Sequence, residues 1–222
     1  MAKGRAKMHF KGAVFDLDGT LWDSMQLWKN IDIKFLAKRG ITYSTDYTVA
    51  IAGLGFEDVA KYTINRFNLP QTPQEVMDEW YNMAKEGYAT DVKLKPGAKD
   101  YLDYLRQNGV RLCIATSLDN SLAVPCLKAN GIYDYFEFFE QAADYQGGKS
   151  NPEIFANCAK KLGLNPGEVA LFEDVFPAVK AAKSAGLLVV AMQEPFSIPQ
   201  AGEIKALADM YITSYAEAPR VE

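Results

Sequence analysis

Short polar motifs follow several apolar runs in this 222-residue sequence, and their side chains can bind a metal ion or a phosphate group. The motifs after apolar runs are Asp16-Leu17-Asp18-Gly19-Thr20, Thr116-Ser117 and Glu173-Asp174, and Lys149 stands just ahead of the helix that Asn151-Pro152 opens. The preceding runs, such as 13–15 and 169–172, are short and apolar enough for strands buried on both faces. Ligands of an open parallel sheet bind outside the carboxyl ends of its strands. We therefore expect these acids, hydroxyls and the lysine to converge at one edge of a sheet.

Carboxylates beside a lysine at such an edge favour a magnesium site, because Mg²⁺ takes oxygen ligands and commonly shares its shell with a substrate phosphate. A carboxylate that approaches a phosphoryl group of charge −2 at about 4 Å meets a repulsion of about 8 kcal/mol at an effective dielectric of 20. A dication between the two groups, with Lys149 alongside, makes the total electrostatic interaction attractive. The residues thus predict phosphoryl chemistry with Mg²⁺ as cofactor.

Residue counts argue against other catalytic classes. The sequence has one histidine, His9, and three separated cysteines, Cys113, Cys126 and Cys158. A Ser-His-Asp or Cys-His centre would depend on His9 alone, and a Cys/His zinc site lacks ligands. Cysteines without a CxxC spacing are expected to be buried, reduced thiols.

Charge and hydropathy restrict the partners. The formal net charge is −4, which disfavours nucleic acid. No apolar run approaches the roughly 18 residues of a membrane span, and no secretory signal follows the basic N-terminus. We expect a soluble, cytoplasmic monomer whose partner is a small phosphorylated molecule, without nucleic acid or membrane.

The order of the predicted elements indicates an α/β fold. Apolar runs at 13–15, 112–115, 169–172 and 187–192 alternate with helix-like stretches, which is typical of a doubly wound, Rossmann-like parallel sheet. Asn151-Pro152 opens one helix, and Gly131 and Gly186 stand where left-handed helix caps are expected. The tail from Ser214 is polar and is expected to be peripheral.

Residues 22–93 interrupt this alternation. The stretch has amphipathic segments that include Leu27, Ile31 and Phe35, and a capping box, Thr72 with Glu75, that starts a further helix. A connection of about seventy residues is far longer than an ordinary loop, so it should pack as a small helical domain. We predict an α/β core of residues 1–21 and 94–222 with an inserted helical domain of residues 22–93. The tryptophans Trp22, Trp28 and Trp80 are expected in the core of that insertion.

The run Phe15-Asp16-Leu17-Asp18-Gly19-Thr20-Leu21, followed in order by Thr116, Lys149 and Glu173-Asp174, resembles the haloacid dehalogenase-like superfamily. The likeness extends from about Phe10 to Thr213 and includes the helical cap of the phosphatase and β-phosphoglucomutase-like branch. It implies Asp16 as a nucleophile that forms an aspartyl-phosphate and Asp18 as general acid and base. It implies Mg²⁺ ligands from Asp16, the Asp18 backbone carbonyl and Asp174, with Glu173 joining or orienting that shell.

The same resemblance implies that Thr116, Ser117 and Lys149 bind phosphoryl oxygens, and that the cap loop with Gly53 and Leu54 selects the substrate. Thr116 has an alternative role as a helix N-cap, for which Ser117 and Asn120 compete. The sequence departs from the family at Val175 and Ala178, where the likeness predicts a serine and a glycine. The cap loop also lacks an arginine or lysine for a second phosphate.

The function predicted from these residues is a Mg²⁺-dependent phosphatase that acts on a small phosphomonoester, a sugar phosphate or a nucleotide. One alternative is a phosphomutase of the β-phosphoglucomutase type, although such enzymes carry a histidine near the position of Trp28. A second is a non-catalytic module that binds a phosphorylated metabolite. Asp18 disfavours a dehalogenase, and Lys61 is the cap lysine available for a phosphonate hydrolase, although nothing near it recommends that role.

Overall fold

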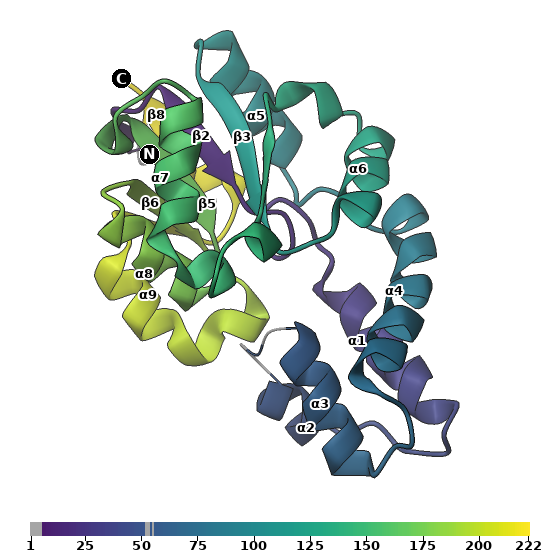
Figure 1. Ribbon diagram of the computed structural model, residues 1–222. Helices are drawn as coiled ribbons and strands as arrows, with labels where there is room; N and C mark the ends of the chain where they lie inside the picture. The colour runs from purple at the N-terminus through teal and green to yellow at the C-terminus, as the bar shows by residue number, and fades with distance from the viewer. Residues whose placement is uncertain (1–5, 52–53, 55) are drawn as a thin grey trace, which may run out of the picture. The chain divides into compact units, whose positions relative to one another are not determined.

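The computed structural model describes residues 6–51, 54 and 56–222, shown as a ribbon in Figure 1. The chain divides into two compact units. Unit 1 comprises Met1–Asp23 and Lys93–Glu222, and unit 2 comprises Ser24–Val92. Helices of the described part of the chain are all too short or too polar to span a bilayer.

Unit 1 is built on a six-stranded sheet in the order β4-β3-β2-β5-β6-β7, and every neighbouring pair in it is parallel. The strands are β2 (Gly12–Phe15), β3 (Arg111–Thr116), β4 (Phe139–Gln141), β5 (Val169–Glu173), β6 (Leu188–Met192) and β7 (Met210–Ile212). The chain runs from β2 outward to β4 and then returns to β5 on the other side of β2. This reversal confirms the predicted doubly wound α/β core, and it occurs at β2, where ligands of such sheets are expected to bind.

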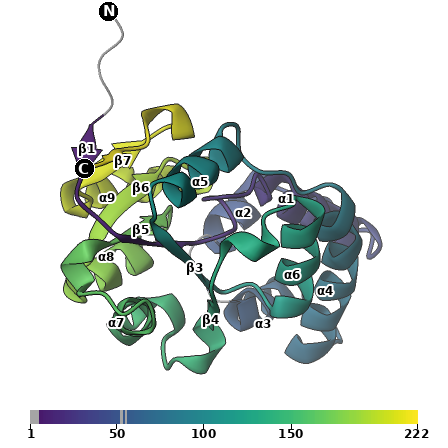
Figure 2. The same cartoon turned by 90° about the horizontal axis from the view of Figure 1, so that it is seen from above.

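Helices cover both faces of this sheet, as Figure 2 shows for α7 and α8 on one side and α5 on the other. The helices of unit 1 are α5 (Ala98–Gln107), α6 (Asn120–Ala129), α7 (Pro152–Lys161), α8 (Phe176–Ser184) and α9 (Ala201–Leu207). Val14, Cys113 and Leu171 share one buried cluster with residues of α7, α8 and α9. On the opposite face Phe15 stacks on Phe172 with ring centroids 4.4 Å apart. Alternate strand residues therefore supply two cores.

Capping residues and glycines explain where several of these helices begin and end. Asn151 accepts a hydrogen bond from the Glu153 amide and caps α7, as its position before Pro152 predicts. Gly131 and Gly186 adopt φ of +67° and +86°, in agreement with their predicted roles beyond helix ends. The three cysteines are buried free thiols, as expected.

Two expectations about unit 1 are wrong. The tail is not peripheral, because Tyr215 is buried and its hydroxyl donates to the Thr20 carbonyl at 3.1 Å. Its end forms β8 (Arg220–Val221), which pairs in parallel with β1 (Lys7–Met8). Trp22 is buried in unit 1 rather than in the insertion, since its backbone bridges to Leu94. These contacts join residues that are far apart in sequence, so the local composition of the tail and of the Trp22 segment did not indicate them.

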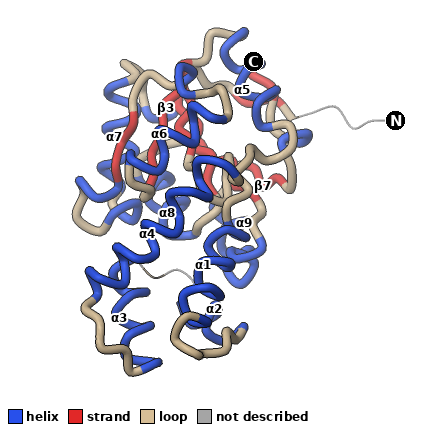
Figure 3. The backbone as a smooth tube through the Cα atoms, turned by 90° about the vertical axis from the view of Figure 1, so that its right-hand side faces the viewer, coloured by secondary structure: helices blue, strands red, loops and turns tan. Residues whose placement is uncertain are grey.

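Helices make up the secondary structure described for unit 2, as the blue segments of Figure 3 show. They are α1 (Met25–Ala37), α2 (Thr45–Ile51), α3 (Phe56–Phe67) and α4 (Pro73–Thr90). The capping box of Thr72 and Glu75 is formed at the start of α4, as predicted. Phe35 and Trp80 pack together with ring centroids 5.3 Å apart in the interior of this unit.

Candidate active site

The loop after β2 begins with Asp16, at the carboxyl end of the strand, and then turns tightly. The Asp16 amide donates to the Phe172 carbonyl of β5 at 3.0 Å, so its backbone extends the strand pairing. The turn places Gly19 at φ +82°, and a Cβ there would lie 2.7 Å from the Oδ2 atom of Asp174. A side chain at position 19 would therefore collide with an acidic group of the site, which explains the glycine of this motif.

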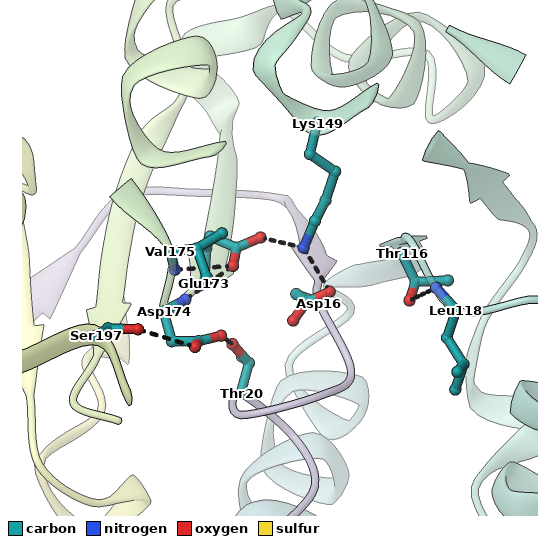
Figure 4. A network of polar contacts seen from close by, with 9 residues as sticks. All are labelled: Asp16, Thr20, Thr116, Leu118, Lys149, Glu173, Asp174, Val175 and Ser197. Atoms are coloured by element: carbon teal, nitrogen blue, oxygen red, sulfur yellow. Dashed lines mark hydrogen bonds and ion pairs between the residues drawn. The ribbon is translucent and has the colours of Figure 1, made fainter. Parts of the chain in front are cut away.

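Three buried carboxylates meet at this edge of the sheet. Oxygen atoms of Asp16, Glu173 and Asp174 lie within 4.8 Å of one another. The three residues are 4%, 0% and 3% exposed, respectively. Figure 4 shows Asp16 and Glu173 at the ammonium group of Lys149, with Asp174 on the side of Thr20 and Ser197. Its Nζ donates to Asp16 Oδ1 at 2.6 Å and to Glu173 Oε2 at 2.7 Å.

Lys149 reaches the site from η3 (Gly148–Ser150), in the connection between β4 and α7. Gly147 and Gly148 both adopt positive φ, at +84° and +60°. The hydroxyl of Tyr145, four residues before Lys149, donates to Glu140 Oε2 of β4 at 2.7 Å and accepts from Asn157 of α7 at 3.1 Å. This network ties the segment that carries the lysine to both neighbouring elements.

Burial dominates the electrostatics of the cluster. It raises the pKa of Asp16 to about 7, with the charge of Glu173 acting in the same direction and that of Lys149 opposing both. Burial likewise raises the pKa of Asp174, together with the charges of Glu173 and Asp16. Burial alone would lower the pKa of Lys149, but the charges of Asp16 and Glu173 outweigh it and raise that pKa. The lysine is therefore a permanent cation.

The donor set fits a hard divalent cation. One lysine balances only one of three buried carboxylates, so the ionised cluster has an uncompensated charge of −2. Oxygen-only ligands and a small buried space are what Mg²⁺ prefers. Asp16 and Asp174 are the residues best suited to hold it, because Glu173 already accepts three hydrogen bonds, one of them from the Lys149 ammonium. Glu173 Oε2 accepts from Lys149, and Oε1 accepts from the amides of Asp174 and Val175 at 2.9 and 3.1 Å.

Thr20 and Ser197 are hydroxyl donors to the cluster that sequence reasoning did not single out. Thr20 Oγ1 donates to Asp174 Oδ1 at 2.9 Å, and Ser197 Oγ donates to Asp174 Oδ2 at 3.3 Å. Thr20 belongs to the quoted acidic motif, so its proximity could have been expected from the turn. Ser197 lies in a segment without any motif, and no signal in the sequence points to it.

Thr116 is the last residue of β3 and lies on the far side of β2 from the acids of β5 (Figure 4), and Ser117 follows it in sequence. Thr116 is 1% exposed, and its Oγ1 accepts from the Leu118 amide at 3.0 Å. The N-cap of α6 is Asp119, whose side chain accepts from the Ser121 amide, so the capping alternative for Thr116, Ser117 or Asn120 is wrong. Ser117 is exposed.

The remaining predicted site residues differ in how they are placed. Asp18 is partly exposed, and its charge contributes to the raised pKa of Asp16. Leu54 lies between α2 and α3 of unit 2 and is 43% exposed. Gly53, the other residue predicted to select substrate, lies outside the described residues.

A comparison with protein families places most of the chain in one match. The profile described as haloacid dehalogenase-like hydrolase matches residues 13–192, which includes the acidic motif, Lys149 and Glu173-Asp174.

Similar proteins include several phosphatases. The chain is 30% identical over 190 residues to the Drosophila melanogaster protein described as "Probable pseudouridine-5'-phosphatase", covering 82% of this chain and 81% of that one. It is 24% identical over 177 residues to the phosphorylated carbohydrates phosphatase of Thermotoga maritima, covering 80% and 82% of the two chains. The crystal structure of CbbY from Rhodobacter sphaeroides with phosphate superposes with a TM-score of 0.79 at 21% identity, covering 94% and 96%. At that identity the last match speaks for the fold alone.

Proposed function

We propose a substrate class and a mechanism from the premise that the chain belongs to the haloacid dehalogenase-like hydrolases, in the helical-cap branch, and is a phosphatase of that family. In this proposal it hydrolyses a small phosphomonoester, a sugar phosphate or a nucleotide, through an aspartyl-phosphate on Asp16. The observation that carries the proposal is the buried cluster of three carboxylates around Lys149. Burying several like charges destabilises a fold, and such clusters with shifted pKa values occur mainly at functional sites.

Asp16 is the nucleophile in this proposal. Its carboxylate is held by the Lys149 ammonium at 2.6 Å, which orients it and favours its charged form. Attack on phosphorus forms a bond from an Asp16 oxygen and breaks the bond to the leaving oxygen. A water molecule then attacks the phosphorus of the aspartyl-phosphate, which releases phosphate and restores the carboxylate.

Asp18 carries the proton. In its acid form it donates a proton to the leaving alkoxide, and in its base form it takes one from the attacking water. It follows Asp16 by two residues, and it is partly exposed where Asp16 is buried. The two carboxyl groups of one short motif thus meet different surroundings, which is how paired acids divide their roles.

Asp16, Asp174 and the backbone carbonyl of Asp18 would hold Mg²⁺, while Glu173 orients Lys149. When bound, Mg²⁺ supplies the positive charge that offsets the repulsion between the Asp16 carboxylate and a phosphoryl dianion. Lys149 and the Thr116 hydroxyl would hold phosphoryl oxygens, with Ser117 beside them. We assign the choice of leaving group to unit 2, to which Leu54 belongs, and keep the role that the family likeness implies for Gly53 and Leu54 as part of this proposal.

The described contacts do not favour the mutase alternative. Trp28, which stands near the position of the mutase histidine, donates its indole N–H to the Tyr88 hydroxyl at 2.9 Å. The sole histidine of the sequence, His9, precedes β2 and is exposed at the opposite end of that strand from Asp16. It is therefore remote from the reacting groups.

The test is phosphate release from an aryl phosphate and from a panel of sugar phosphates and nucleotides, with Mg²⁺ or with a chelator. We expect Mg²⁺-dependent release by the parent and none by Asp16→Asn, while Asp134→Asn, which changes an exposed carboxylate, keeps parental activity. Acid-quenched parent should retain label from a radioactive phosphoryl donor, and Asp16→Asn should not. Full activity of Asp16→Asn would overturn the covalent route. An inactive parent that binds the substrates would favour the binding module.

A further inference from the structure

Each oxygen of the Asp174 carboxylate accepts a hydrogen bond from a different hydroxyl group. Thr20 donates to Oδ1 at 2.9 Å and Ser197 donates to Oδ2 at 3.3 Å. Figure 4 shows the two donors reaching Asp174 from different parts of the chain. A carboxylate held at one oxygen can still rotate, whereas donors on both oxygens determine the orientation of its plane.

The segment that carries Ser197 is itself held in place. Ser197 lies in η5 (Pro195–Gln200), which follows β6, and its amide donates to the Glu194 carbonyl at 2.9 Å. The Glu194 carboxylate pairs with Lys95 at 2.6 Å, and the two side chains are 5% and 15% exposed. The serine therefore projects from an anchored turn rather than from a free loop.

The neighbour of Asp174 along the chain cannot make this contact. Position 175, where the family likeness predicts a serine, is Val175, which has no hydroxyl and whose amide is already bonded to Glu173 Oε1. The hydroxyl on Oδ2 comes instead from Ser197, 23 residues away in sequence. This chain therefore lacks the serine that the family likeness predicts at position 175, and Ser197 supplies a hydroxyl to Asp174 from another segment.

We propose that Ser197 is a positioning residue for Asp174, which it orients to bind the divalent cation. The inference rests on the proposed function, in which Asp174 is a metal ligand. A carboxylate has about four lone-pair sites, so one hydroxyl on each oxygen leaves sites free for a cation. Outer-sphere partners of metal ligands typically change metal affinity by about 10- to 100-fold. The 3.3 Å contact is a long one, which points to the lower end of that range.

The test compares Mg²⁺ binding by isothermal titration calorimetry for the parent and for Ser197→Ala, Ser197→Val and Ser197→Thr. Valine and threonine have the same shape, and only threonine retains a hydroxyl. We expect the dissociation constant for Mg²⁺ to rise about tenfold in the alanine and valine variants and to stay within about twofold of the parent in the threonine variant. Phosphatase kcat at saturating Mg²⁺ should change little, because Ser197 acts through metal affinity.

Ser184→Ala is the matched control. It removes a serine hydroxyl that donates to the Lys180 carbonyl at 3.0 Å within α8, and it should leave Mg²⁺ binding unchanged. Equal Mg²⁺ affinity in the parent and all three Ser197 variants overturns the inference alone, and so does a threonine variant as weak as the valine variant. A parent that binds no Mg²⁺ overturns the proposed metal site and the inference with it.

Discussion

The two units differ in how deeply their charged side chains are buried. Unit 1 buries three carboxylates and Lys149, whose side chain is 11% exposed. In unit 2 ion pairs lie nearer to solvent, as in the pair of Lys61 with Glu57, whose side chains are 51% and 64% exposed. The interior of unit 2 is instead packed with aromatic rings, such as those of Phe35 and Trp80.

This difference favours unit 1 as the unit that carries the proposed chemistry. Buried charges weaken a fold unless they are paired, and the cluster of unit 1 has more acids than bases. Apolar packing such as that of unit 2 stabilises without this cost. One residue of unit 2 departs from the rule: Asp32 of α1 is half-buried, and burial raises its pKa to about 7. Substitutions in the charged cluster of unit 1 should therefore lower both activity and stability, whereas those tested in unit 2 should leave phosphatase activity unchanged.

The largest effect is expected at Lys149. Lys149→Met keeps the length of the side chain but leaves Asp16 and Glu173 without their cation, so the free energy of unfolding should fall by about 3–5 kcal/mol in a chelator. Mg²⁺ should restore part of that loss, and kcat/KM should stay at least about a hundredfold below the parent. Urea unfolding with and without Mg²⁺, together with initial rates, measures both.

Lys180→Met serves as its control, because Lys180 is exposed on α8. If Lys149→Met were as stable and active as this control, the cluster would not depend on its cation, and the contrast between the units would fail.

Asp32 should give the largest pH effect within unit 2. Its pKa is about 7 in the folded chain against 3.8 ordinarily, so the folded state holds an extra proton between these values. The carboxyl therefore stabilises the fold below about pH 4, and that stabilisation is lost as the pH rises through 7. Partial exposure reduces the expected change to about 2 kcal/mol.

Urea unfolding of the parent and Asp32→Asn at pH 4.5 and pH 8 isolates this contribution. The variant should lose less stability than the parent over that range and keep parental phosphatase activity at pH 7. Parallel pH profiles of the two proteins would contradict a raised pKa at Asp32.

A smaller effect is expected at Tyr145 of unit 1. Tyr145→Phe removes the hydroxyl that binds Glu140 and Asn157, and an unsatisfied buried acceptor costs about 1–2 kcal/mol. Because this network holds the segment before Lys149, kcat should fall severalfold as well. Tyr133→Phe, whose ring stacks on Phe139 outside the network, should leave kcat unchanged. A loss of stability without loss of kcat would mean that Lys149 needs no such anchor.

The smallest effect is expected at Lys61 of unit 2. Its ion pairs with Glu57 and Asp58 are exposed, and such pairs contribute little. Lys61→Ala should change neither the melting temperature nor the phosphatase activity measurably. A clear loss of activity would identify this lysine as a functional group, reopen the phosphonate hydrolase alternative, and remove the distinction between the two units.

Sequence patterns predicted the central strands of the sheet, which are apolar runs, and missed the two strands at its edges. The runs at 13–15, 112–115, 169–172 and 187–192 correspond to β2, β3, β5 and β6. The edge strand β4 is Phe-Glu-Gln and has no such run, the edge strand β7 is a run of Met-Tyr-Ile that was not singled out, and α2 has too few residues for a clear helical period. Edge elements are specified by pairing with their neighbours more than by their own composition.

By itself the sequence determined which residues would gather at the carboxyl edge of the sheet, because strand periodicity and the topology of parallel sheets are local and general rules. Only the tertiary structure decided how they pair. The contact of Lys149 with Asp16 spans 133 residues, and that of Ser197 with Asp174 depends on the path of a turn after β6. These contacts follow from the packing of the whole unit. No residue type or spacing near Ser197 predicts that its hydroxyl binds Asp174.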